Sequence, residues 1–156
     1  MFIALQRDFD DFRSWEQVRL GDGVSAEVAG ENDNVTGPRV GFRRQRPTKT
    51  GYPVGSILVK TIEPSDDATQ WLVFAMAKRG GGFNPAGAIG WEFFTIFMTS
   101  GGQPVVRSRG ENPSDATPGA HGYPAGDGTM PTCNRCHGTN AAATDGILSP
   151  ALLPTP

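Results

Sequence analysis

Two cysteines and a histidine form the most chemically specific pattern in the sequence. Cys133 and Cys136 are separated by two residues and His137 follows directly, which gives the arrangement C-x-x-C-H. One helical turn sets both sulfurs along one side of a helix, with the imidazole next to them. Two such thiols can add to the vinyl groups of a porphyrin, and the imidazole can reach its iron. The motif therefore predicts one covalently attached c-type haem, with His137 as the protein ligand of the iron.

Two other uses of the cysteines fit the sequence less well. A zinc site needs about four ligands, but the chain has only these two cysteines, and His121 is the one histidine besides His137. A thioredoxin-like redox dithiol follows an early strand of a βαβ unit, whereas this pair lies near the C-terminus after a loop. Zinc and dithiol chemistry stay open as alternatives, and the spacing and position favour haem.

The sixth coordination position of the iron would separate an electron carrier from a reactive site. The 19 residues after His137 include no methionine or histidine, so a second protein ligand would come from upstream. No spacing favours any one of the upstream candidates. We therefore expect a five-coordinate or weakly capped iron that binds a small molecule. The upstream candidates are Met76, Met98, Met130, His121 or a lysine.

Length and charge limit the remaining classes. A chain of 156 residues fits a single domain over 1–156, and its 14 basic against 16 acidic side chains predict no nucleic-acid or membrane-surface partner. The apolar runs are far shorter than the roughly 20 residues of a membrane helix. The N-terminal apolar run is also too short for a secretory signal. Because covalent haem attachment in bacteria resembles a periplasmic process, we expect a periplasmic protein whose signal has been removed.

The sequence predicts a β-rich α+β fold. Residues 7–19 place Phe9, Phe12, Trp15 and Val18 at steps of three, which predicts an amphipathic N-terminal helix within 1–20. Short, Gly-rich connections favour an antiparallel meander over a parallel sheet. A long loop over 110–132 leads to a short helix at the cysteine motif. The predicted strands are 39–44, 56–62, 71–78, 91–98 and, more weakly, 104–108.

Alternation along these strands sorts side chains by face. Each of three predicted strands has a face that is apolar except for one charged residue. The charged residue is a lysine on two of these strands and a glutamate on the third. Lys78 and Glu92 lie at strand ends, where water can also reach them. The three aligned sets are Leu58, Lys60 and Ile62; Leu72, Phe74, Met76 and Lys78; and Glu92, Phe94, Ile96 and Met98.

Several segments together resemble the cytochrome P460 family, which includes cytochrome c′-β. They are 52–60 (YPVGSILVK), 76–85 (MAKRGGGFNP), 90–94 (GWEFF) and 133–138 (CNRCHG). Each segment alone is weakly specific, and their order and spacing make the resemblance. It covers most of the chain after the predicted first helix and implies a β-rich, periplasmic mono-haem protein.

The resemblance also implies candidate site residues for two chemistries. P460 proteins carry a lysine–haem cross-link and oxidise hydroxylamine, whereas c′-β proteins lack it, cap the iron with phenylalanine and bind nitric oxide. Lys60 looks like the cross-linking lysine, with Lys78 in reserve, and Glu92 resembles the distal carboxylate that takes protons. Arg43 or Arg44 resembles the distal arginine, and Phe42 and Phe74 are candidates for an apolar wall at the haem.

Three functions follow from this reading, in order of preference. The first is hydroxylamine oxidation, with electrons passed to a soluble acceptor such as another cytochrome. The second is binding of nitric oxide or another small gas without turnover. The third is simple electron transfer, which requires an upstream sixth ligand. The resemblance also implies a homodimer, for which exposed strand edges offer a route.

Overall fold

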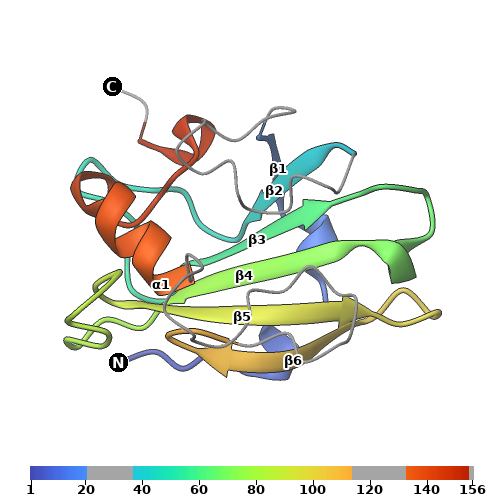
Figure 1. The fold of residues 1–156 in the computed structure, drawn as a ribbon, viewed down its shortest axis with the longest axis horizontal. Helices are drawn as coiled ribbons and strands as arrows, with labels where there is room; N and C mark the ends of the chain where they lie inside the picture. Colours follow the sequence, from blue (N-terminus) through green and yellow to red (C-terminus); the bar gives the residue numbers. More distant parts are fainter. Residues whose placement is uncertain (21–36, 114–132, 155–156) are drawn as a thin grey trace.

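The chain forms a six-stranded antiparallel sheet in which the strands lie in sequence order (Figure 1). The computed structural model describes residues 1–20, 37–113 and 133–154. The fold is therefore mostly β with a few short helices, and the predicted antiparallel meander is confirmed. The strands are β1 (Glu16–Arg19), β2 (Arg39–Arg43), β3 (Ile57–Ile62), β4 (Leu72–Lys78), β5 (Trp91–Met98) and β6 (Pro104–Gly110).

The helical segments are all short and lie outside the sheet. The longest continuous run is α1 followed directly by a π-helical turn, and it contains the cysteine motif. Within the described part of the chain, no helix has the length and apolar character needed to cross a membrane. The segments are η1 (Gln6–Asp8), η2 (Phe12–Ser14), η3 (Ala68–Gln70), α1 (Cys133–Arg135), η4 (Cys136–Asn140), η5 (Ala142–Thr144) and η6 (Pro150–Leu152).

The five predicted strands all form, with ends that differ by no more than two residues from the predicted ranges. Proline or glycine lies at or within two residues of the ends of β3, β4 and β6. The connection between β4 and β5 contains Gly80, Gly81 and Gly82 in left-handed conformations, with φ of 67°, 64° and 73°. Glycine reaches this region without steric cost, so the chain turns there and β5 returns beside β4.

The N-terminal segment is less helical than its pattern predicts. Two 3₁₀ turns, η1 and η2, replace the continuous helix, and Glu16–Arg19 pair with β2 as the edge strand β1. Phe9 and Phe12 are buried as expected, but Val18 packs on the other side of the sheet. The spacing of these apolar residues by three is typical of a helix. Here the residues are apolar because the chain passes around the edge of the sheet and packs against the apolar clusters on both of its faces.

One face of the sheet packs against the N-terminal segment, which is blue in Figure 1. We call it the N-terminal face. Aromatic rings of this face pack against aromatic rings of the N-terminal segment. The ring centroids of Phe9 and Phe94 are 5.0 Å apart, and those of Phe12 and Phe42 are 5.2 Å apart. Burial of these aromatic side chains stabilises this layer. The buried sheet residues of this face are Val40, Phe42, Ile57, Val59, Val73, Ala75, Ala77, Phe94, Ile96 and Met98.

The other face packs against the C-terminal segment, which is orange to red in Figure 1. We call it the motif face, because Cys133 packs against its apolar cluster. Trp91 is fully buried there and lies edge-on to Tyr52, with the ring centroids 5.9 Å apart. The buried cluster consists of Tyr52, Leu58, Met76, Ala88, Trp91, Phe93, Ile147 and Leu152.

Candidate functional site

The cysteine motif occupies one continuous stretch of helix on the motif face. Cys133 begins α1, Cys136 begins the π-helical turn η4, and both are partly buried thiols. A separation of three residues brings two side chains to the same side of a helix. Wider π-helical turns occur often at functional sites. The short helix predicted at this motif is confirmed, and it carries both thiols.

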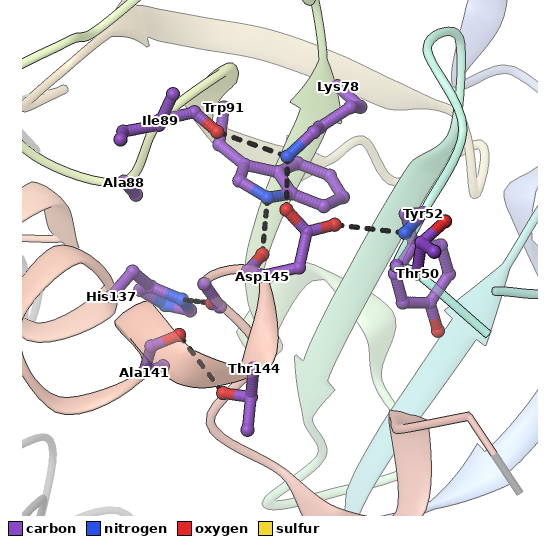
Figure 2. Close-up of polar contacts among 12 residues, drawn as sticks. Thr50, Tyr52, Lys78, Ala88, Ile89, Trp91, His137, Ala141, Thr144 and Asp145 are labelled. Atoms are coloured by element: carbon purple, nitrogen blue, oxygen red, sulfur yellow. Dashed lines mark hydrogen bonds and ion pairs between the residues drawn. The ribbon is translucent and has the colours of Figure 1, made fainter. Parts of the chain in front are cut away.

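The imidazole of His137 is oriented by a short contact with the backbone. Its Nδ1 lies 2.6 Å from the carbonyl oxygen of Gly146 (Figure 2). A carbonyl only accepts hydrogen bonds, so Nδ1 must carry the proton. In the neutral ring the lone pair is therefore on Nε2. In histidine-ligated metal sites, a contact of this kind fixes the tautomer and increases the basicity of the ligating nitrogen.

The imidazole also packs on the sheet. Phe93 of β5 lies 5.0 Å from the His137 ring between centroids, with an interplanar angle of 46°. Phe93 is buried, and its face of β5 is the motif face. Contact with an apolar ring excludes water from this side of the imidazole and strengthens its hydrogen bond to Gly146.

A tight turn after the motif supplies the Gly146 carbonyl. Gly146 donates its backbone N–H to the Ala141 carbonyl at 2.8 Å, and the Thr144 hydroxyl donates to Ala141 at 3.0 Å and to Ile147 at 2.7 Å. Gly146 has φ of 77°, and a Cβ there would lie 3.1 Å from Cδ1 of Trp91. Glycine is therefore required by both conformation and space.

Asn134, between the two cysteines, fixes the helix to the β4–β5 connection. Its side-chain oxygen accepts hydrogen bonds from the backbone N–H of Ala88, at 2.9 Å, and from the Asn84 side-chain amide. The backbones also touch closely, since a Cβ on Gly138 would lie 2.6 Å from the carbonyl carbon of Gly87. The sequence pattern assigns no structural role to Asn134, because its partners are about fifty residues away in the chain.

Lys60 and Phe74 are brought together on the motif face. They are directly paired across β3 and β4, and both are partly buried. Leu58, two residues before Lys60, belongs to the apolar cluster that contacts Cys133. The structure thus places the predicted cross-linking lysine and one predicted wall residue on the face that packs against the motif.

Lys78, the reserve lysine, also lies on the motif face but is engaged elsewhere. Its ammonium forms an ion pair with Asp145 and donates to the Ile89 carbonyl at 3.0 Å (Figure 2). The ammonium lies 4.8 Å from the centroid of the Trp91 ring. Lys78 therefore holds the turn that follows the motif.

Glu92, predicted as a residue of the haem site, lies on the N-terminal face, opposite the face against which the cysteine motif packs. It is directly paired with Ala77, and its carboxylate accepts a two-pronged hydrogen bond from Arg109 with both distances 2.8 Å. Arg79 makes a further contact at 3.4 Å, and Glu92 is only 3% exposed. The sheet separates this carboxylate from His137. Glu92 is therefore a structural ion-pair partner, and the ion pair with Glu92 raises the pKa of Arg109.

The other predicted pocket residues divide between the two faces. Phe42 packs edge-on against Phe12 in the N-terminal core, so it is not a wall residue of the motif face. Arg44 forms an ion pair with Asp8 at 3.2 Å, on the same side as η1. Arg43 is directly paired with Leu58 on the motif face. Adjacent residues of a strand point to opposite faces, so only one of the two arginines could be near the motif.

Arg43 is held by an ion-pair cluster at the edge of the sheet. Glu16 accepts two hydrogen bonds at 2.8 Å from Arg43 and two at 2.9 Å from Arg46. These contacts lower the pKa of Glu16 to about 2. Burial raises the pKa of the neighbouring Tyr52 hydroxyl, which donates to the Leu152 carbonyl at 2.7 Å. The cluster therefore ties Arg43 to the fold and keeps its charge near the C-terminal segment.

Candidates for a second iron ligand are separated in the same way. Met76 is buried on the motif face, and Met98 is buried on the N-terminal face. His121, Met130 and most of the predicted 110–132 loop lie outside the described residues. In the described ranges, no three His, Cys, Asp or Glu side chains gather into a group that could hold a metal ion. The iron of a c-type haem needs only one protein side chain as a ligand, so it does not require a group of this kind.

Comparisons of this chain with known protein families, curated protein sequences and solved structures find no match.

Proposed function

We propose that this chain is a mono-haem c-type cytochrome whose haem is attached through Cys133 and Cys136 and ligated by His137. The observation that supports it most directly is the hydrogen bond from His137 Nδ1 to the Gly146 carbonyl, 2.6 Å long. It places the ring proton on Nδ1, which is the tautomer of histidines that bind metals through Nε2.

The donor set fits the haem in other respects. The two thiols, three residues apart, belong to a helix that Asn134 anchors to the β4–β5 connection, and the ring of His137 rests on Phe93. Thioether formation adds each thiol across a vinyl group and needs no other protein group. A pre-ordered helix lowers the entropy lost on attachment. The two cysteines therefore hold the haem, and the histidine orients toward its iron.

The proposed activity is oxidation of hydroxylamine, with electrons passed to a soluble acceptor such as another cytochrome. A bound haem would supply a redox-active iron with an open coordination position. Lys60 is the proposed cross-linking lysine because it is partly buried beside Phe74 on the motif face. Phe74 would exclude water from bound hydroxylamine. Glu92 has no part in this proposal because it lies on the N-terminal face.

A second candidate, nitric oxide binding without turnover, is favoured by one observation. Glu92, the carboxylate expected to take protons from hydroxylamine, is directed away from the motif face and held by Arg79 and Arg109. Binding of nitric oxide requires no proton acceptor and suits an apolar wall formed by Phe74. Both candidates use the same haem attachment, and they differ in whether Lys60 is linked to the macrocycle.

We also propose a periplasmic location, because the attachment of haem to C-x-x-C-H motifs in bacteria resembles a periplasmic process. A homodimer is proposed through the sheet edges, of which β6 is the longer with seven residues.

Turnover separates the two candidates. Purified haem-loaded protein would be mixed with hydroxylamine and an artificial electron acceptor, and acceptor reduction would be followed optically. The proposal predicts steady reduction by the wild-type protein and none by Cys133→Ser/Cys136→Ser. Stoichiometric nitric oxide binding with no acceptor reduction would instead establish the gas-binding function.

A further inference from the structure

We propose that Asp145 and Lys78 are positioning residues that select the tautomer of His137 by fixing the Gly146 carbonyl. The consequence for haem ligation rests on the proposed function. The selection of the tautomer itself is a property of the polypeptide and is testable without haem.

Asp145 is fixed at three of its atoms. Its backbone carbonyl accepts a hydrogen bond of 2.6 Å from the Trp91 indole N–H, and one carboxylate oxygen accepts from the Tyr52 backbone N–H at 2.9 Å. The other carboxylate oxygen binds the ammonium of Lys78. Figure 2 shows Lys78, Trp91 and Tyr52 converging on this one residue. The turn is thereby tied to three separate parts of the motif face.

The backbone conformation of Asp145 depends on these contacts. Asp145 has φ of 55°, in the left-handed region that costs a side-chain-bearing residue about 1 kcal/mol or more. Asp and Asn tolerate this region better than other residues with a Cβ. Gly146 comes next, so a change in the Asp145 dihedrals rotates the Gly146 carbonyl away from His137.

The ion pair is shielded enough to act as a clamp. The side chains of Lys78 and Asp145 are 13% and 24% exposed, and the Trp91 ring covers the ammonium. Lys78 also donates to the Ile89 carbonyl, so its own position is set by the β4–β5 connection. Partly buried pairs of this kind are less screened by salt than surface pairs.

The chemical effect would be on His137. A protonated Nδ1 bonded to a carbonyl raises the electron density on Nε2 and makes it a stronger iron ligand. Loss of the carbonyl would remove the contact that favours a proton on Nδ1 over one on Nε2. Asp145 and Lys78 would thus set the strength of the axial ligand without touching the iron.

The first test is nuclear magnetic resonance of the histidine ring in the full chain produced without haem. Long-range proton–nitrogen correlations report which ring nitrogen carries the proton, and His121→Gln separates the signals of the two histidines. The wild-type ring is expected to be Nδ1-protonated. Asp145→Ala and Lys78→Met should each shift the tautomer ratio toward Nε2–H by roughly three- to tenfold, the equivalent of one lost hydrogen bond.

Two further variants make the result specific. Asp145→Asn keeps an acceptor for Tyr52 and tolerates the left-handed conformation, so an intermediate shift is expected. Asp67→Ala is the matched control, because Asp67 accepts a hydrogen bond of 3.0 Å from Thr69 at the start of η3, away from the motif. It should lower the melting temperature and leave the His137 tautomer unchanged.

The second test uses the haem-loaded protein. Asp145→Ala should lower the iron–histidine stretching frequency of the ferrous protein and raise its reduction potential. The positioning role would be overturned if Asp145→Ala and Lys78→Met both left the tautomer ratio of His137 unchanged and only lowered stability, as Asp67→Ala is expected to do. Failure of the chain to take up haem would instead overturn the proposed function, and the ring measurement would still decide this inference.

Discussion

The side-chain oxygen of Asn134 accepts a hydrogen bond from the backbone N–H of Ala88 at 2.9 Å. This contact joins the residue between the two cysteines to the connection that follows β4. The same oxygen accepts from Asn84, which is 2% exposed. The motif helix is therefore anchored from within the motif, next to the atoms that would bind haem.

Replacing Asn134 with alanine should destabilise the protein by about 1–3 kcal/mol, because the buried Ala88 N–H loses its acceptor and the Asn84 amide loses one of three acceptors. Urea unfolding of the full chain measures this loss. Thr139→Ala is the control, since Thr139 is exposed on the same helical stretch and should change stability by less than about 0.5 kcal/mol. Equal stability of the two variants would contradict the anchoring role.

Neutralising Glu92 should affect stability and leave chemistry intact. Glu92→Gln removes the charge that pairs with Arg79 and Arg109, and we expect a loss of about 1–3 kcal/mol, since one arginine is partly exposed. Hydroxylamine turnover per folded, haem-loaded molecule should stay within about twofold of the wild-type rate. A loss of turnover of a hundredfold or more at unchanged stability would return Glu92 to the active site.

Lys60 and Lys78 are predicted to differ in their chemistry. Peptide mapping of the haem-loaded protein should find a haem-linked peptide containing Lys60, and Lys60→Met should abolish both this link and the red shift of the Soret band. Lys78→Met should keep the link and lower the melting temperature, because it breaks the pair with Asp145. An unmodified Lys60 in active protein would contradict the cross-link proposal.

Acid stability should depend on Glu16. Because Arg43 and Arg46 lower its pKa from 4.5 to about 2, the folded state gains stability from Glu16 above pH 4.5. This gain is lost as the pH falls from about 4.5 toward 2. Melting temperatures measured across this range should therefore fall less steeply for Glu16→Gln than for the wild type. Neutralising the exposed Glu111 is the control, and an identical slope in both variants would contradict the cluster.

The sequence predicts much of the sheet because its signals are local. Alternating apolar residues and Gly-rich connections determine strands such as β4 and β5 and their antiparallel pairing. The prediction fails at β1, where Phe9, Phe12 and Val18 have helical spacing but pack into two different cores. The spacing shows only which residues are apolar. It cannot show that the chain crosses the edge of the sheet, so that its apolar residues pack on two different faces.

The site is harder to predict because it depends on which face receives the C-terminal segment. Alternation correctly groups Glu92 with Phe94, but it cannot tell that this face lies opposite the motif. The roles of Asn134 and Asp145 leave no sequence signal, since their partners are distant in the chain. The C-x-x-C-H spacing is recognisable because its geometry lies within one helical turn.

The most direct test of the central claim is the intact mass of the full chain, exported to a periplasm that contains the haem-attachment machinery and then denatured. We predict the mass of the polypeptide plus one haem, retained after extraction with acid and organic solvent, and the mass of the polypeptide alone for Cys133→Ser/Cys136→Ser. A wild-type mass without haem, under conditions in which a control c-type cytochrome is loaded, would contradict the account.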